Sequence, residues 1–177
     1  MPSVFSHAVV GAALGTLFRR PGPPARFWLA GAAGAVVPDL DVIGRWFGIP
    51  WGHVLGHRGI THSIAFAAAL AALVAWSLAG PGRRGMLWLF VFVATASHGV
   101  LDAMTDGGSG VAFFAPVDAT RYFLPWRPIP VSPIGFRFFG EYGREVFEHE
   151  LLIVWLPSAV LAALAWAGRA RRGAPTR

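Results

Sequence analysis

The sequence contains no cysteine and no lysine, and it has few charged residues of any kind. The absence of cysteine excludes disulfides, cysteine-ligated zinc, iron–sulfur clusters and thiol nucleophiles. Charged residues make up only 14% of the chain, whereas a soluble domain usually has about 25%. Apolar residues make up 55%, and the mean hydropathy is +0.54. This balance predicts a membrane protein, and 177 residues predict a single domain.

Five apolar segments follow one another along the chain. They are Val4–Phe18, Phe27–Val37, His62–Ala79, Met86–Val100 and Leu151–Ala167. A transmembrane helix needs about 20 residues. The third and fifth segments meet this requirement, and the others do so only with their polar flanks. We therefore predict an all-α, polytopic membrane bundle with about four to five transmembrane helices. Val4–Phe18 lacks the basic region that precedes a cleavable signal peptide.

The 15 basic residues, all arginine, are distributed unevenly. Nine lie in three stretches that contain no acidic residue: 19–26, 83–84 and 169–177. The positive-inside rule places this face in the cytoplasm and the N-terminus outside. We thus predict a membrane-embedded domain over 1–168 and a basic cytoplasmic tail over 169–177. Because the arginines lie beside apolar runs, the net charge of +6 indicates contact with membrane lipid rather than nucleic acid.

All nine acidic residues and all six histidines lie in segments predicted to meet the opposite, outer face. The longest connection on that face, 103–150, is rich in Phe, Pro, Arg and Gly. It is too apolar for an ordinary solvated loop and too rich in proline for a span. We expect an ordered, partly interfacial segment whose aromatic rings lie at headgroup depth.

Three short motifs carry groups capable of metal chemistry. Pro38-Asp-Leu-Asp41 places two carboxylates at the end of the second apolar segment. His57-Arg-Gly-Ile-Thr-His-Ser63 packs two histidines, an arginine and two hydroxyls in front of the third. His98-Gly-Val-Leu-Asp102 has His and Asp at i and i+4, on one face of a helix. Taken singly, each motif also fits a solvated helix end or a His–Asp hydrogen bond.

The predicted topology brings these motifs to one membrane face. The candidate metal ligands are His7, Asp39, Asp41, His57, His62, His98 and Asp102. Imidazoles and carboxylates without cysteine suit Zn²⁺, with Mn²⁺ or Fe²⁺ as alternatives. Seven ligands exceed the need of one tetrahedral ion, so we expect two or more ions. His53, His149 and Glu150 fit ligation and interfacial placement equally well.

The three motifs, in this order between apolar runs, resemble the YdjM-type family of bacterial and archaeal membrane-bound metal-dependent hydrolases. The resemblance covers roughly residues 1–135, and its most specific part is the block His57–Ser63. It implies an integral inner-membrane protein with a metal-dependent hydrolase activity. The family has a distant similarity to the all-helical zinc phospholipases C and nucleases. The resemblance further implies that the seven residues named above are candidate ligands.

The resulting hypothesis is a hydrolase of a phosphoester in a lipid or lipid-linked substrate, using water activated by the metal. Arg58, together with Arg121 and Arg127 of the outer loop, is a candidate to hold phosphate oxygens, although the two loop arginines fit binding of lipid headgroups equally well. Asp41 or Asp106 is the candidate general base. One alternative is a non-enzymatic metal-binding or transport protein. A haem protein with paired histidines is less consistent with the accompanying aspartates.

Overall fold

A computed structural model describes residues 1–18 and 24–173 of the chain, and across this part the protein is helical without a β-strand. The main helices are α1 (Val4–Gly15), α2 (Pro24–Val36), α3 (Ile64–Leu78), α4 (Arg84–Ala103), α5 (Glu141–Glu150) and α6 (Leu156–Gly173). The 3-10 helices are η1 (Val37–Phe47), η2 (Ile60–His62), η3 (Pro81–Arg83) and η4 (Gly135–Phe139), and η5 (Leu151–Trp155) is a π-helical turn. The prediction of a helical membrane bundle is therefore confirmed.

Within the described residues, three helical stretches are long and apolar enough to cross a membrane. They are Phe27–Phe47 with 21 residues, Pro81–Ala103 with 23 and Glu141–Arg169 with 29. The helices α1 and α3 are apolar but shorter. With 15 residues, α3 is shorter than the sequence predicted. The Ser63 hydroxyl accepts a hydrogen bond from the N–H of Phe66 at 3.0 Å and starts the helix there, which leaves His62 outside it.

The second span gains its length from η1, which continues α2 without a gap. Pro38 stands at the start of η1, and because proline has no N–H it cannot continue the α-helical hydrogen-bond ladder. The tighter 3-10 geometry carries the chain on to Phe47, where Gly48 ends it in the left-handed conformation (φ 78°). The two carboxylates of the Asp39–Asp41 motif therefore project from a 3-10 helix.

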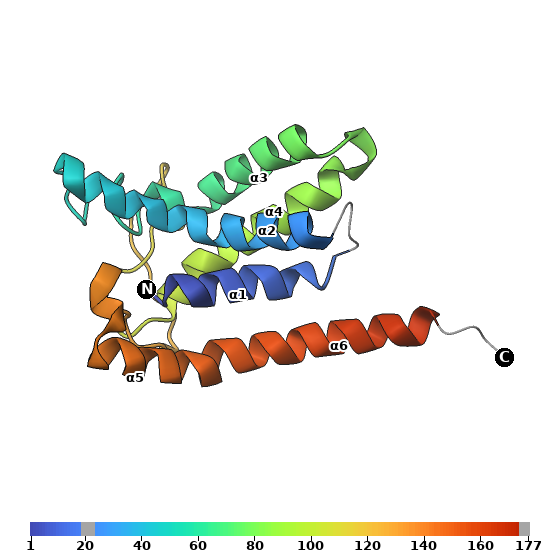
Figure 1. Cartoon of the computed structure of the whole chain (residues 1–177). Helices are drawn as coiled ribbons and strands as arrows, with labels where there is room; N and C mark the ends of the chain where they lie inside the picture. The colour runs from blue at the N-terminus through green and yellow to red at the C-terminus, as the bar shows by residue number, and fades with distance from the viewer. Residues whose placement is uncertain (19–23, 174–177) are drawn as a thin grey trace.

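Figure 1 shows a bundle whose polar and basic segments lie at opposite ends. The N-terminus, η1 and α5 lie at one end, and the α3–α4 connection and the C-terminal part of α6 lie at the other (Figure 1). The candidate ligands belong to the first end, and Arg83 and Arg84 to the second. The predicted separation of the two kinds of segment thus appears in the fold, and which end faces the cytoplasm stays a prediction. Residues 19–23 of the first basic stretch lie outside the described residues.

The apolar core lies among α2, α3 and α4. Phe90 is fully buried and its ring stacks on that of Phe27, with 4.2 Å between the centroids. Alanines of α3 fill the other side, with Ala71 and Ala75 completely buried. Small residues let α3 and α4 approach closely, as is usual for helices that associate within a membrane.

The helix α6 contributes little to this core. Only 6% of the apolar window in Glu141–Arg169 is buried, compared with 50% for Pro81–Ala103. The helix runs beside α1 (Figure 1) and continues to Gly173. The predicted domain boundary at residue 168 therefore does not coincide with a helix end. Residues 174–177 of the predicted tail lie outside the described part of the chain.

The long segment after α4 is mostly irregular but carries its own buried residues. Val111, Ala115 and Ile129 are completely buried. Two isolated bridges, Thr105 with Ile129 and Val111 with Tyr122, hold its turns together. These contacts fit the expectation of an ordered segment, and α5 is a helix within it that the sequence analysis did not predict.

Candidate metal centre

His62 is the residue around which the polar cluster is arranged. It ends the short η2 turn and is 4% exposed. The preceding Arg58 has a positive φ of 62°, which is uncommon for a residue with a side chain and is often found at functional sites. Gly99 of α4 lies against the backbone of His62, since a Cβ there would be 2.9 Å from the His62 carbonyl oxygen. The glycine in His98-Gly-Val-Leu-Asp102 therefore lets α4 approach the loop.

Four buried side chains point their ligand atoms at a common volume. The members of this first group are Asp39, His62, His98 and Asp102, whose ligand atoms all lie within 4.8 Å of one another. The Nε2 atoms of His62 and His98 are 3.0 Å apart. Nε2 of His98 is 3.3 Å from Asp39 Oδ1, and Nε2 of His62 is 3.3 Å from Asp102 Oδ2. The group combines η1, η2 and α4, which are separated in sequence but meet at one end of the bundle.

The Nδ1 atoms of both histidines already have partners, which determines how the rings are presented. Nδ1 of His98 lies 2.7 Å from the carbonyl oxygen of Ala35. Because a carbonyl only accepts, Nδ1 must carry the proton, and the lone pair of Nε2 faces the group. Nδ1 of His62 lies 3.2 Å from Asp41 Oδ2. Metal-binding histidines usually donate their second ring nitrogen to a carbonyl or carboxylate in this way.

The two facing Nε2 atoms require a positive charge or a proton between them. Without an ion, a proton on His62 meets this need. Burial lowers the pKa of His62, but hydrogen bonds to Asp102, Asp39 and Asp41 outweigh that effect and raise the pKa to about 10. The carboxylates that stabilise an imidazolium here would equally stabilise a divalent cation.

The carboxylates of Asp39 and Asp102 are met by ion-pair contacts of 3.1–3.9 Å from Arg58, His62 and His98. Both ring nitrogens of His7, which lies beside the group, are buried without a hydrogen bond among the described residues. The His7 ring stacks on that of His98 at 3.7 Å, and its Nε2 is 3.5 Å from Asp102 Oδ1. A buried polar atom left without a partner costs about 1–3 kcal/mol. A cation within the group would bind both carboxylates and the two facing Nε2 atoms, so the residues present fit a bound divalent metal.

A second group, formed by Asp41, His57 and His62, has a different character. Asp41 Oδ1 lies 2.8 Å from Nδ1 of His57, and Asp41 Oδ2 accepts a hydrogen bond of 2.6 Å from the Thr61 hydroxyl. Both carboxylate oxygens of Asp41 therefore already have partners. The two groups share His62 through its two different ring nitrogens.

Arg58 adds a buried guanidinium to the cluster. It is 2% exposed, and its Nε lies 3.1 Å from Asp102 Oδ2. The two terminal nitrogens donate hydrogen bonds to Gly107 O at 3.1 Å and Thr105 Oγ1 at 3.0 Å. Arg58 thus fixes the loop after α4 to the His57–Ser63 block and partly neutralises Asp102.

The two loop arginines have different surroundings. Arg121 donates to the backbone carbonyls of Trp51, His53 and His57 at 2.9–3.2 Å, and burial lowers its pKa. It therefore joins the 51–57 loop to the segment after α4. Arg127 is exposed and its guanidinium lies 5.0 Å from the ring centroid of Phe123.

The remaining candidates lie outside both groups. The Asp106 carboxylate accepts a hydrogen bond from the N–H of Val131 at 3.0 Å. His53 and His149 bond locally, the first with the N–H of Leu55 and the second with the carbonyl of Glu145.

Glu150, in contrast, is completely buried and accepts hydrogen bonds at the start of α1. The donors are the N–H of Ser3 at 2.5 Å, the Ser3 hydroxyl, and the Ser6 hydroxyl at 2.7 Å. The sequence offers no local signal for this role, because the partners are at least 144 residues apart. The other contributor that the sequence analysis did not identify is the carbonyl of Ala35, a backbone group without a motif.

Fold and cluster together define a helical membrane protein with a buried histidine–aspartate site at one end of the bundle. Comparison with known proteins agrees: residues 1–174 match the YdjM inner membrane protein family, and the chain belongs to this family. It is 38% identical over 169 residues to inner membrane protein YbcI of Escherichia coli (strain K12), covering 94% of this chain and 98% of that protein. No solved structure matches the chain. The predicted family and inner-membrane location are thereby confirmed.

Proposed function

We propose that this chain is a membrane-bound, metal-dependent hydrolase of a phosphoester in a lipid or lipid-linked substrate. The observation that carries the proposal is the first group, in which two histidine Nε2 atoms and two carboxylates meet in a buried volume. Asp39, His62, His98 and Asp102 would hold the ion, with His7 beside them. A set of imidazoles and carboxylates favours Zn²⁺, with Mn²⁺ or Fe²⁺ as alternatives.

A divalent ion in such a site acts as a Lewis acid and lowers the pKa of water to near 7. The chain's own residues orient the ligands. The Asp41 carboxylate accepts a hydrogen bond from Nδ1 of His62, and the carbonyl oxygen of Ala35 accepts one from Nδ1 of His98. Arg58 balances the charge of Asp102. The second group, with Asp41 and His57, would offer a position for a further ion through Nδ1 of His62 if that nitrogen lost its proton and the contact with Asp41.

One observation favours a second candidate function. His98 and Asp102 are completely buried, and His62 is 4% exposed. Such burial restricts the access of a substrate and suits a non-enzymatic metal-binding protein, in which the ion stabilises the fold or is stored.

Metal content and hydrolysis, measured on the same preparations, separate these functions. The detergent-purified protein is loaded with Zn²⁺, Mn²⁺ or Fe²⁺, desalted and analysed by mass spectrometry, with His98→Ala, Asp39→Ala and the control His149→Ala beside it. We expect at least about one ion per chain for the wild type and the control, and loss of most of it in the other two, since losing a ligand removes several kcal/mol of metal affinity. A wild type that stays free of metal after loading contradicts the proposal.

Hydrolysis is then assayed with a chromogenic phosphodiester and with phospholipids in mixed micelles. The hydrolase proposal expects turnover that a chelator abolishes and that His98→Ala lacks. Bound metal with no turnover of either substrate class favours the non-enzymatic alternative.

A further inference from the structure

The last residue of α5, Glu150, is a buried acidic side chain that contacts the first turn of α1. Its two oxygens accept hydrogen bonds from the N–H of Ser3 at 2.5 Å, from the Ser3 hydroxyl, and from the Ser6 hydroxyl at 2.7 Å. An acidic side chain buried within a membrane-spanning stretch is costly and usually has a functional role. Glu150 belongs to neither ligand group, so its burial needs another explanation.

The chain directly after Glu150 forms the π-helical turn η5, which brings a second contact to the same place. The indole N–H of Trp155 donates a hydrogen bond to the Ser6 hydroxyl at 2.9 Å. In an α-helix, residues five apart point about 140° away from each other, whereas the i→i+5 hydrogen bonds of a π-helix place them on successive turns of nearly the same face. The π turn therefore lets both Glu150 and Trp155 reach Ser6, and such turns are frequent at functional sites.

The first turn of α1 also carries His7, which lies beside the candidate metal centre. The N–H of His7 donates to the Ser3 carbonyl at 3.3 Å, and Ser6 precedes His7 in the sequence. The His7 ring stacks on that of His98 with 3.7 Å between the centroids, and its Nε2 lies 3.5 Å from Asp102 Oδ1. The two serines that bind the buried carboxylate therefore belong to the short stretch of backbone that carries His7.

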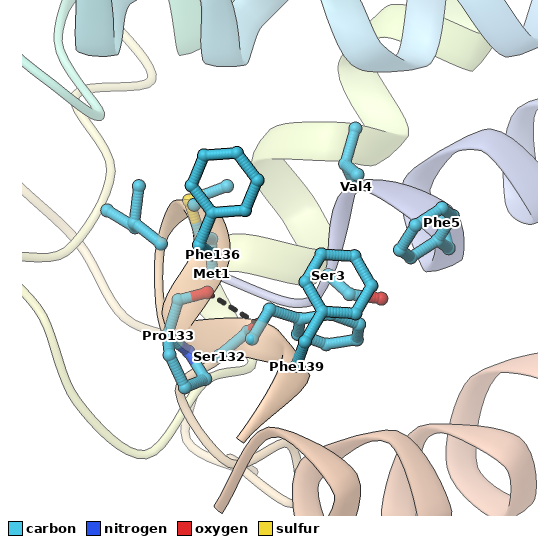
Figure 2. Close-up of a pocket in the computed structure, with 11 residues that line it drawn as sticks. Met1, Ser3, Val4, Phe5, Ser132, Pro133, Phe136 and Phe139 are labelled. Atoms are coloured by element: carbon cyan, nitrogen blue, oxygen red, sulfur yellow. Dashed lines mark hydrogen bonds between the residues drawn. The ribbon is translucent and has the colours of Figure 1, made fainter.

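The apolar contacts of this first turn are less complete than those of the rest of α1. A cavity of about 330 Å³ separates the start of α1 from η4, and its walls include Val4 and Phe5 on one element and Phe136 and Phe139 on the other (Figure 2). Further along, α1 packs closely on α2, where a Cβ at Gly11 would lie 2.4 Å from a backbone oxygen. Close packing thus fixes the middle of the helix, and hydrogen bonds to the carboxylate fix its start.

We propose that Glu150 is a positioning residue of the candidate metal centre, which holds His7 in place for the ion through Ser3 and Ser6. Both ring nitrogens of His7 are buried without a hydrogen bond within the described part of the chain, and a neutral imidazole offers a lone pair on one of them. Glu150 acts through the start of α1 and not by contact with the ion. This inference rests on the proposed function, because it adds a support to the same metal site.

The Zn²⁺ affinity of the detergent-purified full chain tests the proposal. Competition with a chromogenic chelator measures it at one pH and at a temperature well below the unfolding midpoint of every variant, so that lower stability alone does not change it. Glu150→Gln removes the anionic acceptor and keeps the size of the side chain. Glu148→Gln is the matched control at an exposed position of α5. Leu87→Ala is a second control, which destabilises the apolar core near the start of α4.

Glu150→Gln should bind Zn²⁺ about tenfold more weakly than the wild type, because residues that orient metal ligands typically contribute roughly 10- to 100-fold to affinity. His7→Ala should weaken binding at least as much, and the double variant should bind no more weakly than His7→Ala alone. Both controls should keep the wild-type affinity, although Leu87→Ala unfolds at a lower temperature. Wild-type affinity in Glu150→Gln or in His7→Ala, or losses that add up in the double variant, overturns the proposal.

Ser6→Ala tests the same link if Glu150→Gln does not fold, because it removes the hydroxyl that lies between Glu150 and Trp155. It should show a similar loss of affinity, and wild-type affinity in this variant would overturn the proposal. Failure of the proposed function gives a different result. A wild type that binds no metal contradicts the metal-dependent hydrolase and this inference together, whereas Zn²⁺ binding that Glu150→Gln leaves unchanged contradicts the positioning role alone.

Discussion

Replacing Arg58 by Met tests whether the buried ion pair with Asp102 holds the centre together. Arg58 is 2% exposed and its Nε is 3.1 Å from a carboxylate that is completely buried. Removing one partner of a buried pair usually costs about 3–5 kcal/mol, because the other charge is left uncompensated. Methionine retains a Cβ, so the strain of the positive φ at this position stays the same. The difference between the two proteins therefore reports the loss of the charged side chain and its contacts.

The surroundings of Asp102 moderate this estimate. Nε2 of His62 at 3.3 Å and Nε2 of His7 at 3.5 Å still face the carboxylate. We therefore expect a loss of about 3 kcal/mol, at the lower end of that range. For a chain of this size about 1 kcal/mol corresponds to 2–4 °C, so the midpoint of thermal unfolding should fall by roughly 6–12 °C.

The assay is thermal unfolding in detergent with a chelator present, so that no metal compensates Asp102. Arg127→Met is the matched control, because Arg127 is exposed and its guanidinium lies over the ring of Phe123. The midpoint of this variant should shift by no more than about 2 °C from that of the wild type. The double variant Arg58→Met/Asp102→Asn should lose less unfolding free energy than the two single variants lose in total. A midpoint for Arg58→Met equal to that of Arg127→Met would refute the reasoning.

Three further predictions concern other parts of the centre and its supports. Gly108→Ala should destabilise the protein by about 1–3 kcal/mol in thermal unfolding, because Gly108 has φ +90° and a Cβ would lie 2.6 Å from an Arg58 nitrogen; a wild-type midpoint would contradict this. Glu150→Gln should lower the free energy of unfolding by about 1.5–3 kcal/mol, because the buried carboxylate accepts hydrogen bonds from two serines at the start of α1. The control Glu148→Gln changes a side chain that is 61% exposed and should leave the midpoint of thermal unfolding nearly unchanged. Zinc affinity should rise about tenfold per pH unit from pH 6 to 8, because His62, whose pKa is raised to about 10, must release a proton to bind the ion. Competition with a chromogenic chelator measures this affinity, and an affinity that does not change with pH would contradict the prediction.

The sequence predicted the fold class and the end of the bundle at which the polar residues gather, because both follow from hydropathy and arginine distribution. It could not predict which ligand atoms meet. Asp39 and Asp41 are two residues apart, yet they approach opposite nitrogens of one imidazole. This arrangement depends on the 3-10 geometry that begins near Pro38, and the hydropathy pattern does not distinguish 3-10 from α-helix.

Other features were missed because their partners are remote in sequence. Arg121, a candidate for binding phosphate or lipid headgroups, donates to three backbone carbonyls of the 51–57 loop, which the sequence did not indicate. Backbone acceptors leave no trace in a motif. The contact of Asp106 was equally unpredictable, because its carboxylate accepts a hydrogen bond from the N–H of Val131, 25 residues further along the chain.

The low burial of α6 has a consequence for the order of events during synthesis. Every residue of the two ligand groups precedes residue 103, and α6 adds little to the core around them. The 75 residues that follow Asp102 take roughly 4–15 s to translate at about 5–20 residues per second. The histidine–aspartate cluster therefore has time to close on the nascent chain, and α5 and α6 then arrive at a bundle already formed, which they join through Glu150 of α5 and the first turn of α1.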